Sequence, residues 1–262
     1  MTGAYLVWLL VPLAYILAFS FDRSITATRW EGFSLRWWLP WGRGSIFSDP
    51  TITLAVRHTL TLAIVATTIS LPLGTSLALG VRHLTRRAAF TIYAVLVLAI
   101  AFPPVALADA LWIVFSVPLR GFPFGEFGWF GTRAQTLGLV TLQLPFVALI
   151  VSARLASISM EQEELASDLG APPRDVVTRV LLPQIGAAVG AATAVAVSIG
   201  IGEAVVADTL RSTDATRTLA SSFFSRDLAP QTYALGAAIA ALGFISSALV
   251  LTALRLGNRR RS

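Results

Sequence analysis

Three acidic residues border long apolar stretches and could act on a charged solute. Asp109 follows the break at Phe102-Pro103-Pro104, while Glu203 and Asp208 follow another apolar run. Acids at membrane depth usually line a water-filled path or pair with a base. A carboxylate lining a passage would compensate the ammonium groups of a polycation. Pairing of Glu203 or Asp208 with Arg211 is the structural alternative.

Other reactive groups are scarce in this sequence. It has no Cys, which excludes disulfides, thiolate catalysis and Cys-ligated metals. Without any Lys it cannot form a Walker loop, so it is not an ATPase. It also lacks zinc-protease and nucleophile-elbow motifs. His58 and His83 fall at the ends of apolar runs, where we expect an interfacial and a solvated side chain rather than a metal or protease site.

The composition indicates a protein embedded in lipid. Of 262 residues, 55% are hydrophobic and 13% are charged, about half the charge of a soluble domain. The net charge of +6 comes from scattered arginines, with no solvated basic face to bind nucleic acid. We therefore predict an all-α integral membrane protein.

Runs without charged side chains set the expected architecture. A helix needs about 20 residues to cross the hydrocarbon layer, and backbone amides in lipid must bond within their own segment. The runs predict six transmembrane helices in a single domain, 1–262, at roughly 1–21, 55–81, 88–117, 134–155, 183–209 and 229–255. The first is expected to be a helix rather than a cleaved signal, because no basic residue precedes Tyr5 and the stretch is too long. It starts so near Met1 that a short segment before Met1 is also expected.

Arginine density predicts the orientation. Arginines are concentrated in the short connections at 82–87, 154–180 and 255–262, and short arginine-rich connections favour the cytoplasm. Both termini are then cytoplasmic. The opposite connections carry aromatic clusters, which either anchor the protein at the membrane interface or contact an external partner. These clusters are Trp30, Trp37, Trp38 and Trp41, and Phe122, Phe124, Phe127, Trp129 and Phe130.

The connection at 156–182 carries the most specific pattern. Acidic residues at 161–164 favour the start of a helix, and Leu165 and Leu169 form a small apolar face at i, i+4 spacing. Gly170 ends that helix, and Pro172 and Pro173 prevent its continuation. We predict two short helices separated by a break, with Pro183 marking the return to the bilayer.

This spacing resembles the EAA loop of ABC importer permeases of type I: E-A-A, three residues, G, nine residues, I, one residue, L-P. Leu165 replaces the first Ala, which enlarges the apolar face, and Val180 replaces Ile. In that family the loop is a coupling helix that sits in a groove of the ATPase. The resemblance assigns coupling to Glu164, Leu165, Ala166, Leu169, Gly170, Ala171, Leu182 and Pro183.

The resemblance also implies an assembly. It predicts a six-helix, MetI-like permease that forms half of a solute pathway with a second, different permease subunit. An ATPase dimer would hold ATP and Mg, and an extracytoplasmic binding protein would deliver the solute. Segments such as Arg29-Trp30-Glu31-Gly32-Phe33 are most similar to the second permease of spermidine/putrescine importers. Iron, thiamine, sugar or anion import remain alternatives, and an ion-coupled secondary transporter is the rival class.

Overall fold

The computed structural model describes residues 2–24, 29–40, 45, 47–116, 131–224 and 234. Within these ranges the regular structure is helical, as predicted, and one isolated bridge joins Asp22 to Phe33. Among the described residues, three segments are long and apolar enough to cross a membrane, or four if the bent pair described below is one span. The predicted helix at 229–255 lies outside the described residues, and so does the aromatic cluster at 122–130.

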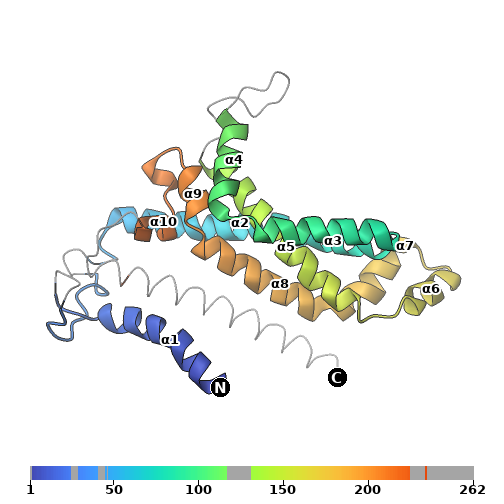
Figure 1. Ribbon diagram of the computed structural model, residues 1–262, viewed down its shortest axis with the longest axis horizontal. Helices are drawn as coiled ribbons and strands as arrows, with labels where there is room; N and C mark the ends of the chain where they lie inside the picture. The colour runs from blue at the N-terminus through green and yellow to red at the C-terminus, as the bar shows by residue number, and fades with distance from the viewer. Residues whose placement is uncertain are drawn as a thin grey trace.

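Three long helices form the centre of the molecule: α2 (Pro50–Arg82), α5 (Thr132–Leu155) and α8 (Leu182–Gly202). They run side by side in Figure 1. Asp49 starts α2 because its carboxylate accepts a hydrogen bond from the Thr51 amide at 2.9 Å. Small and branched side chains fill the space between the helices, including Ala78, Val147, Val151, Ile185 and Ala192.

Glycines let these helices approach closely. A Cβ at Gly200 would lie 2.8 Å from the Cα of Ala63, and one at Gly74 would lie 2.7 Å from Val147 Cγ1. In lipid, where burial of apolar surface drives helix association weakly, such small residues permit the backbone contact that holds helices together. The glycines therefore fix the distances from α2 to α8 and from α2 to α5.

The predicted helix 88–117 is two helices. It divides into α3 (Arg86–Ala101) and α4 (Pro104–Ser116), which meet at an angle of 100°. Pro103 and Pro104 lack the amide protons that would continue the ladder, so the chain turns there. As a result α4 leaves the direction of α3 and packs against α9 (Val205–Thr209) (Figure 1).

The predicted segment 183–209 is also interrupted. α8 ends at Gly202, and α9 follows after Glu203 and Ala204. A 3-10 turn, η4 (Asp214–Thr216), and α10 (Leu219–Phe224) complete this end of the bundle. We call it the α9 end. Its core contains Ala108, Phe115, Ala134, Val206 and Leu210.

The opposite end, called the α6 end, holds the predicted loop 156–182. It contains α6 (Glu161–Asp168), the short α7 (Pro173–Asp175) and η3 (Val176–Leu181), a π-helical turn that runs directly into α8. The predicted pair of short helices with a break is therefore present, but the second one is continuous with the long helix. Figure 1 shows α6 beyond the ends of α2, α5 and α8.

The first predicted helix is α1 (Thr2–Phe19), which Figure 1 shows apart from the three central helices. After it, the chain folds back at the α9 end. The buried Asp22 accepts hydrogen bonds from Ser24 Oγ at 2.7 Å and from the Glu31 amide at 3.0 Å. Trp37 donates its indole proton to the Asp22 carbonyl at 2.8 Å and packs against Ile52 and Leu219.

Candidate functional site

The end of α6 is built around a left-handed glycine. Gly170 has φ +82°. Its amide donates to Ser167 O at 2.9 Å, and the Ala171 amide donates to Ala166 O at 3.0 Å. These two bonds form the Schellman motif, which satisfies the last carbonyls of a helix. Beyond its chain neighbours, no atom of the described residues lies within 4 Å of where a Gly170 Cβ would be. The positive φ, rather than close packing against that part of the chain, is therefore what favours glycine here.

The predicted apolar face of α6 points away from the protein. The exposed fraction is 63% for Leu165 and 88% for Leu169. Glu164 is exposed beside them, and Ala166 is half-buried. Two exposed leucines one turn apart on a short helix form a small apolar face that a protein partner can cover. The structure thus presents Glu164, Leu165 and Leu169, three of the residues for which the resemblance predicts an ATPase contact, on one outward surface.

Glu163, which precedes Glu164 of the E-A-A pattern, was not singled out by the sequence analysis. Glu163 is buried, and its Oε1 lies 2.5 Å from Nε of Arg82 at the end of α2. Its other oxygen lies 3.5 Å from His83 Nε2. Three acids in four positions suggested only a helix start, and no periodic signal distinguished Glu163 from its neighbours. The exposed His83 ring agrees with the expected solvated side chain.

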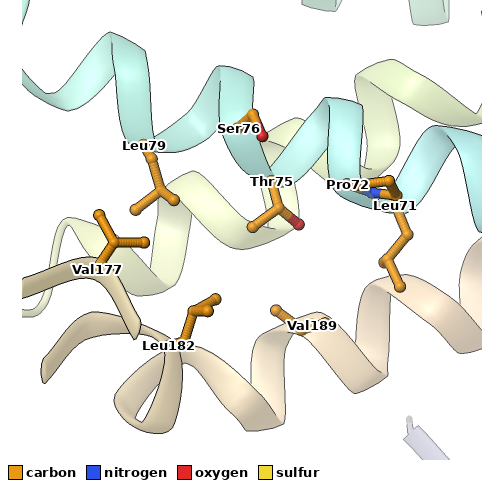
Figure 2. A pocket seen from close by; sticks show the side chains of 8 residues that line it. All are labelled: Leu71, Pro72, Thr75, Ser76, Leu79, Val177, Leu182 and Val189. Carbon is orange, nitrogen blue, oxygen red and sulfur yellow. The ribbon is translucent and has the colours of Figure 1, made fainter. Parts of the chain in front are cut away.

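Leu182 and Pro183 complete the motif at the start of α8. Leu182 lines an apolar groove of about 330 Å³ between α2 and the η3–α8 segment. Figure 2 shows Leu71, Thr75 and Leu79 from α2 on one side of this groove, facing Val177, Leu182 and Val189. Motif residues therefore lie in two places: those before Ala171 on the outward surface of α6, and Leu182 in the groove.

The three candidate path acids lie toward the α9 end, and two of them have partners. Glu203 Oε1 accepts the amides of Val205 at 2.7 Å and Val206 at 2.9 Å, so it caps the start of α9. Asp208 Oδ1 lies 3.3 Å from Arg211 Nε, which is the structural alternative expected for it. Asp109 is exposed on α4, the helix that packs against α9.

Two buried glutamines join helices across the bundle, and no local sequence pattern marks either of them. Gln143 accepts a hydrogen bond from Ser70 Oγ at 2.8 Å and donates to Ala196 O at 2.9 Å, so it joins α2, α5 and α8. Gln135 donates to Ala207 O at 2.6 Å and to Thr216 O at 2.8 Å. Its Oε1 lies 2.9 Å from His58 Nε2, which places His58 in a structural contact.

The packed apolar helices and the bent pair α3–α4 are typical of a multi-pass membrane protein. Comparison with known proteins makes this specific. Residues 70–260 match the family described as binding-protein-dependent transport system inner membrane component. The match covers most of the chain, which therefore belongs to this family of transport permeases.

Curated relatives agree with the family. The spermidine/putrescine transport system permease protein PotC of Escherichia coli (strain K12) is 24% identical over 206 residues, covering 79% of this chain and 73% of the relative. The putrescine transport system permease protein PotI from the same strain is 28% identical over 204 residues, covering 76% and 69%. Like these relatives, the chain is a permease of the ABC importer class. The family match also favours that class over an ion-coupled secondary transporter.

Solved structures share the fold. A chain of a bacterial ABC transporter involved in the import of the acidic polysaccharide alginate has a TM-score of 0.72 at 16% identity, covering 98% of this chain and 93% of that chain. A chain of the MetNI methionine ABC transporter has a TM-score of 0.62 at 18% identity, covering 80% and 98%. The type I importer permease fold predicted from the sequence is confirmed.

Proposed function

We propose that this permease forms half of a polyamine import pathway and that α6 is its contact with an ATPase subunit. The observation that carries the proposal is the outward surface of Leu165 and Leu169, held by the Gly170 turn. Burying one leucine side chain contributes about 1.5–3 kcal/mol. Two leucines can therefore supply much of a docking energy while the helix itself stays fixed to the bundle.

The proposed assembly follows the family. An ATPase dimer would hold ATP and Mg and bind the α6 end, which would then be cytoplasmic together with both chain termini. A second permease chain would complete the passage, and an extracytoplasmic binding protein would deliver solute at the α9 end. The concentration of arginines at 82–87 and 154–180 supports this orientation. The alginate transporter structure that includes a periplasmic protein supports the general arrangement.

The substrate proposal depends on the relatives. PotC and PotI are named for spermidine and putrescine transport, and the likeness covers about three quarters of this chain. Of the three candidate acids, Asp109 is the strongest for contact with a passing ammonium group, because it is exposed on α4. Glu203 and Asp208 have roles in holding α9. We propose that Glu203 and Asp208 affect the path mainly by holding α9 in place.

Cysteine crosslinking tests the ATPase contact directly. The chain has no Cys, so Leu169→Cys introduces a single thiol, and the ATPase groove can carry the second. We expect a crosslink in the assembled complex and none with Cys at Val205, an exposed position on α9 at the opposite end. Absence of the Leu169 crosslink in a complex that retains both subunits would refute the contact.

Uptake by reconstituted complex tests the substrate. Spermidine and putrescine should be taken up and should bind the partner binding protein, and Asp109→Asn should lower uptake. Uptake of thiamine, ferric iron, a sugar or an anion instead would refute the polyamine proposal and leave the ATPase contact standing. Purification of a complex with this chain as the sole permease species would refute the second chain.

A further inference from the structure

Arg82 joins three parts of the α6 end. Its guanidinium donates to the carbonyls of Leu155, the last residue of α5, and of Ile158, the latter at 2.9 Å. The same group pairs with Glu163 on α6 at 2.5 Å. The side chain is only 8% exposed. One cation therefore fixes the end of α2 to the end of α5, to the connection that follows it, and to α6.

The attachment of α6 is polar on this side. Its leucines at 165 and 169 face outward, whereas Glu163 turns inward to α2. On a second side Gln184 donates to Gln162 Oε1 at 2.8 Å, and this contact joins α6 to α8 at an exposed position. Arg82 Nε and Glu163 Oε1 form an ion pair without hydrogen-bond geometry. Because this pair is buried, water and salt screen it much less than they screen an exposed contact, so it holds α6 against α2 more firmly than the exposed amide pair does.

We infer that the Arg82–Glu163 pair is a positioning contact that makes α6 move with α2, and so transmits ATPase motion to the membrane helices. The inference rests on the proposed role of α6 as the ATPase contact. A force applied to the outward leucines reaches the bundle through the contacts of an eight-residue helix. If Glu163 loses its charge, α6 can tilt on the ATPase without displacing α2. The complex then hydrolyses ATP but moves solute less often.

Removing one charge while keeping the shape tests this role. In the assembled, reconstituted complex, Glu163→Gln and Arg82→Gln should lower the ratio of solute imported to ATP hydrolysed by about twofold to thirtyfold, the range for variants along a coupling route. The ratio for Arg82→Lys should lie between those of the two Gln variants and that of the unmodified protein, because lysine keeps the charge but lacks the forked guanidinium donor. Two matched controls lie on exposed side chains nearby. Glu161→Gln on α6 and Arg179→Gln on η3 should leave the ratio unchanged.

A double variant separates positioning from simple loss of stability. If the pair acts as a unit, Arg82→Gln combined with Glu163→Gln should reduce the ratio no further than Arg82→Gln alone. Additive losses, an unchanged ratio in Glu163→Gln, or a fall only in the amount of assembled complex would overturn the inference. The Leu169→Cys crosslink is measured in the same complexes. Its absence in the otherwise unmodified protein refutes the ATPase contact, whereas its presence with an unchanged ratio in Glu163→Gln refutes the positioning role alone.

Discussion

The two ends of the bundle are held together by different chemistry. At the α9 end a neutral amide, Gln135, is fully buried and bonds to two backbone carbonyls and His58, while Val206, Leu210 and Leu219 are buried around it. At the α6 end a charged pair attaches a helix whose leucines face water.

This difference suggests that the α9 end contributes mainly to the stability of the fold and the α6 end mainly to contact with a partner. At the α9 end the buried amide of Gln135 is satisfied by backbone carbonyls within this chain, so its contribution is to stability. The α6 end leaves the leucines of α6 uncovered and holds that helix with a buried ion pair, which suits a surface that a second protein covers. Substitutions at the α9 end should therefore change unfolding, and those on the outward α6 surface should change assembly.

The largest expected effect is at Gln135. Gln135→Leu removes the donors to Ala207 O and Thr216 O and leaves His58 without this contact. Each buried polar group without a partner costs about 1–3 kcal/mol, so we expect a loss of roughly 2–5 kcal/mol. Thermal unfolding in detergent measures it. Gln184→Leu, at the exposed amide pair of the α6 end, should cost less than about 1 kcal/mol, and equal losses would erase the contrast between the ends.

The next effect concerns assembly. Leu169→Ala should weaken ATPase binding by roughly thirtyfold, equivalent to about 2 kcal/mol of lost burial, and should leave the unfolding temperature of the isolated permease unchanged because the side chain is exposed. Titration of purified ATPase against the permease measures the affinity. Leu84→Ala, another exposed leucine near this end, is the control. A similar loss there would mean that the docking surface is not confined to α6.

A smaller effect is expected at the α6 turn. Gly170→Ala should cost about 1–2 kcal/mol because a side chain is strained at positive φ, whereas Gly170→Asn should cost less. Amide hydrogen exchange over 161–171 reports the loosened turn. Gly80→Ala is the control, because it lies inside α2 with free space around it and alanine favours helix there. Equal exchange in Gly170→Ala and the unmodified protein would show that the turn is not strained.

The smallest effect is a pH dependence at the α9 end. Burial raises the pKa of Asp22, but hydrogen bonds from Ser24, Glu31 and Arg23 outweigh it and lower that pKa below its usual 3.8. The native fold thus favours the ionised form, so its contribution to stability is present above about pH 4 and is lost as pH falls through the lowered pKa. Trp37 fluorescence should change in that acid range, and Asp22→Asn should remove the change. A transition that persists in Asp22→Asn would have another origin.

Sequence patterns anticipated the long apolar elements. Hydrophobic length placed spans at 55–81 and 134–155, which lie inside or nearly coincide with α2 and α5. Local chain chemistry placed the end of α6 at Gly170. Both signals depend on residues close together in the sequence, where composition and turn preferences suffice.

Contacts between distant residues were not predictable in the same way. Gln135 and Gln143 occur in otherwise apolar runs, and nothing local says that Ala207 O or Ser70 will meet them. Glu163 and Arg82 are 81 positions apart, so their pairing depends on how α2 and α6 meet. The prolines at 103 and 104 signalled a break, but the 100° turn depends on the packing of α4 against α9.

The π-helical turn η3 determines which way the first turn of α8 faces. Such turns widen a helix by one residue, as a single inserted amino acid would, and they recur at functional sites. Residues after an insertion of this kind face a direction about 100° away from the one a regular helix would give them. Val176–Leu181 separates the outward α6 surface from Leu182 in the groove. Leu182 therefore faces the groove by way of the extra residue in η3, and a regular α-helix over 173–202 would turn this side chain about 100° away from it.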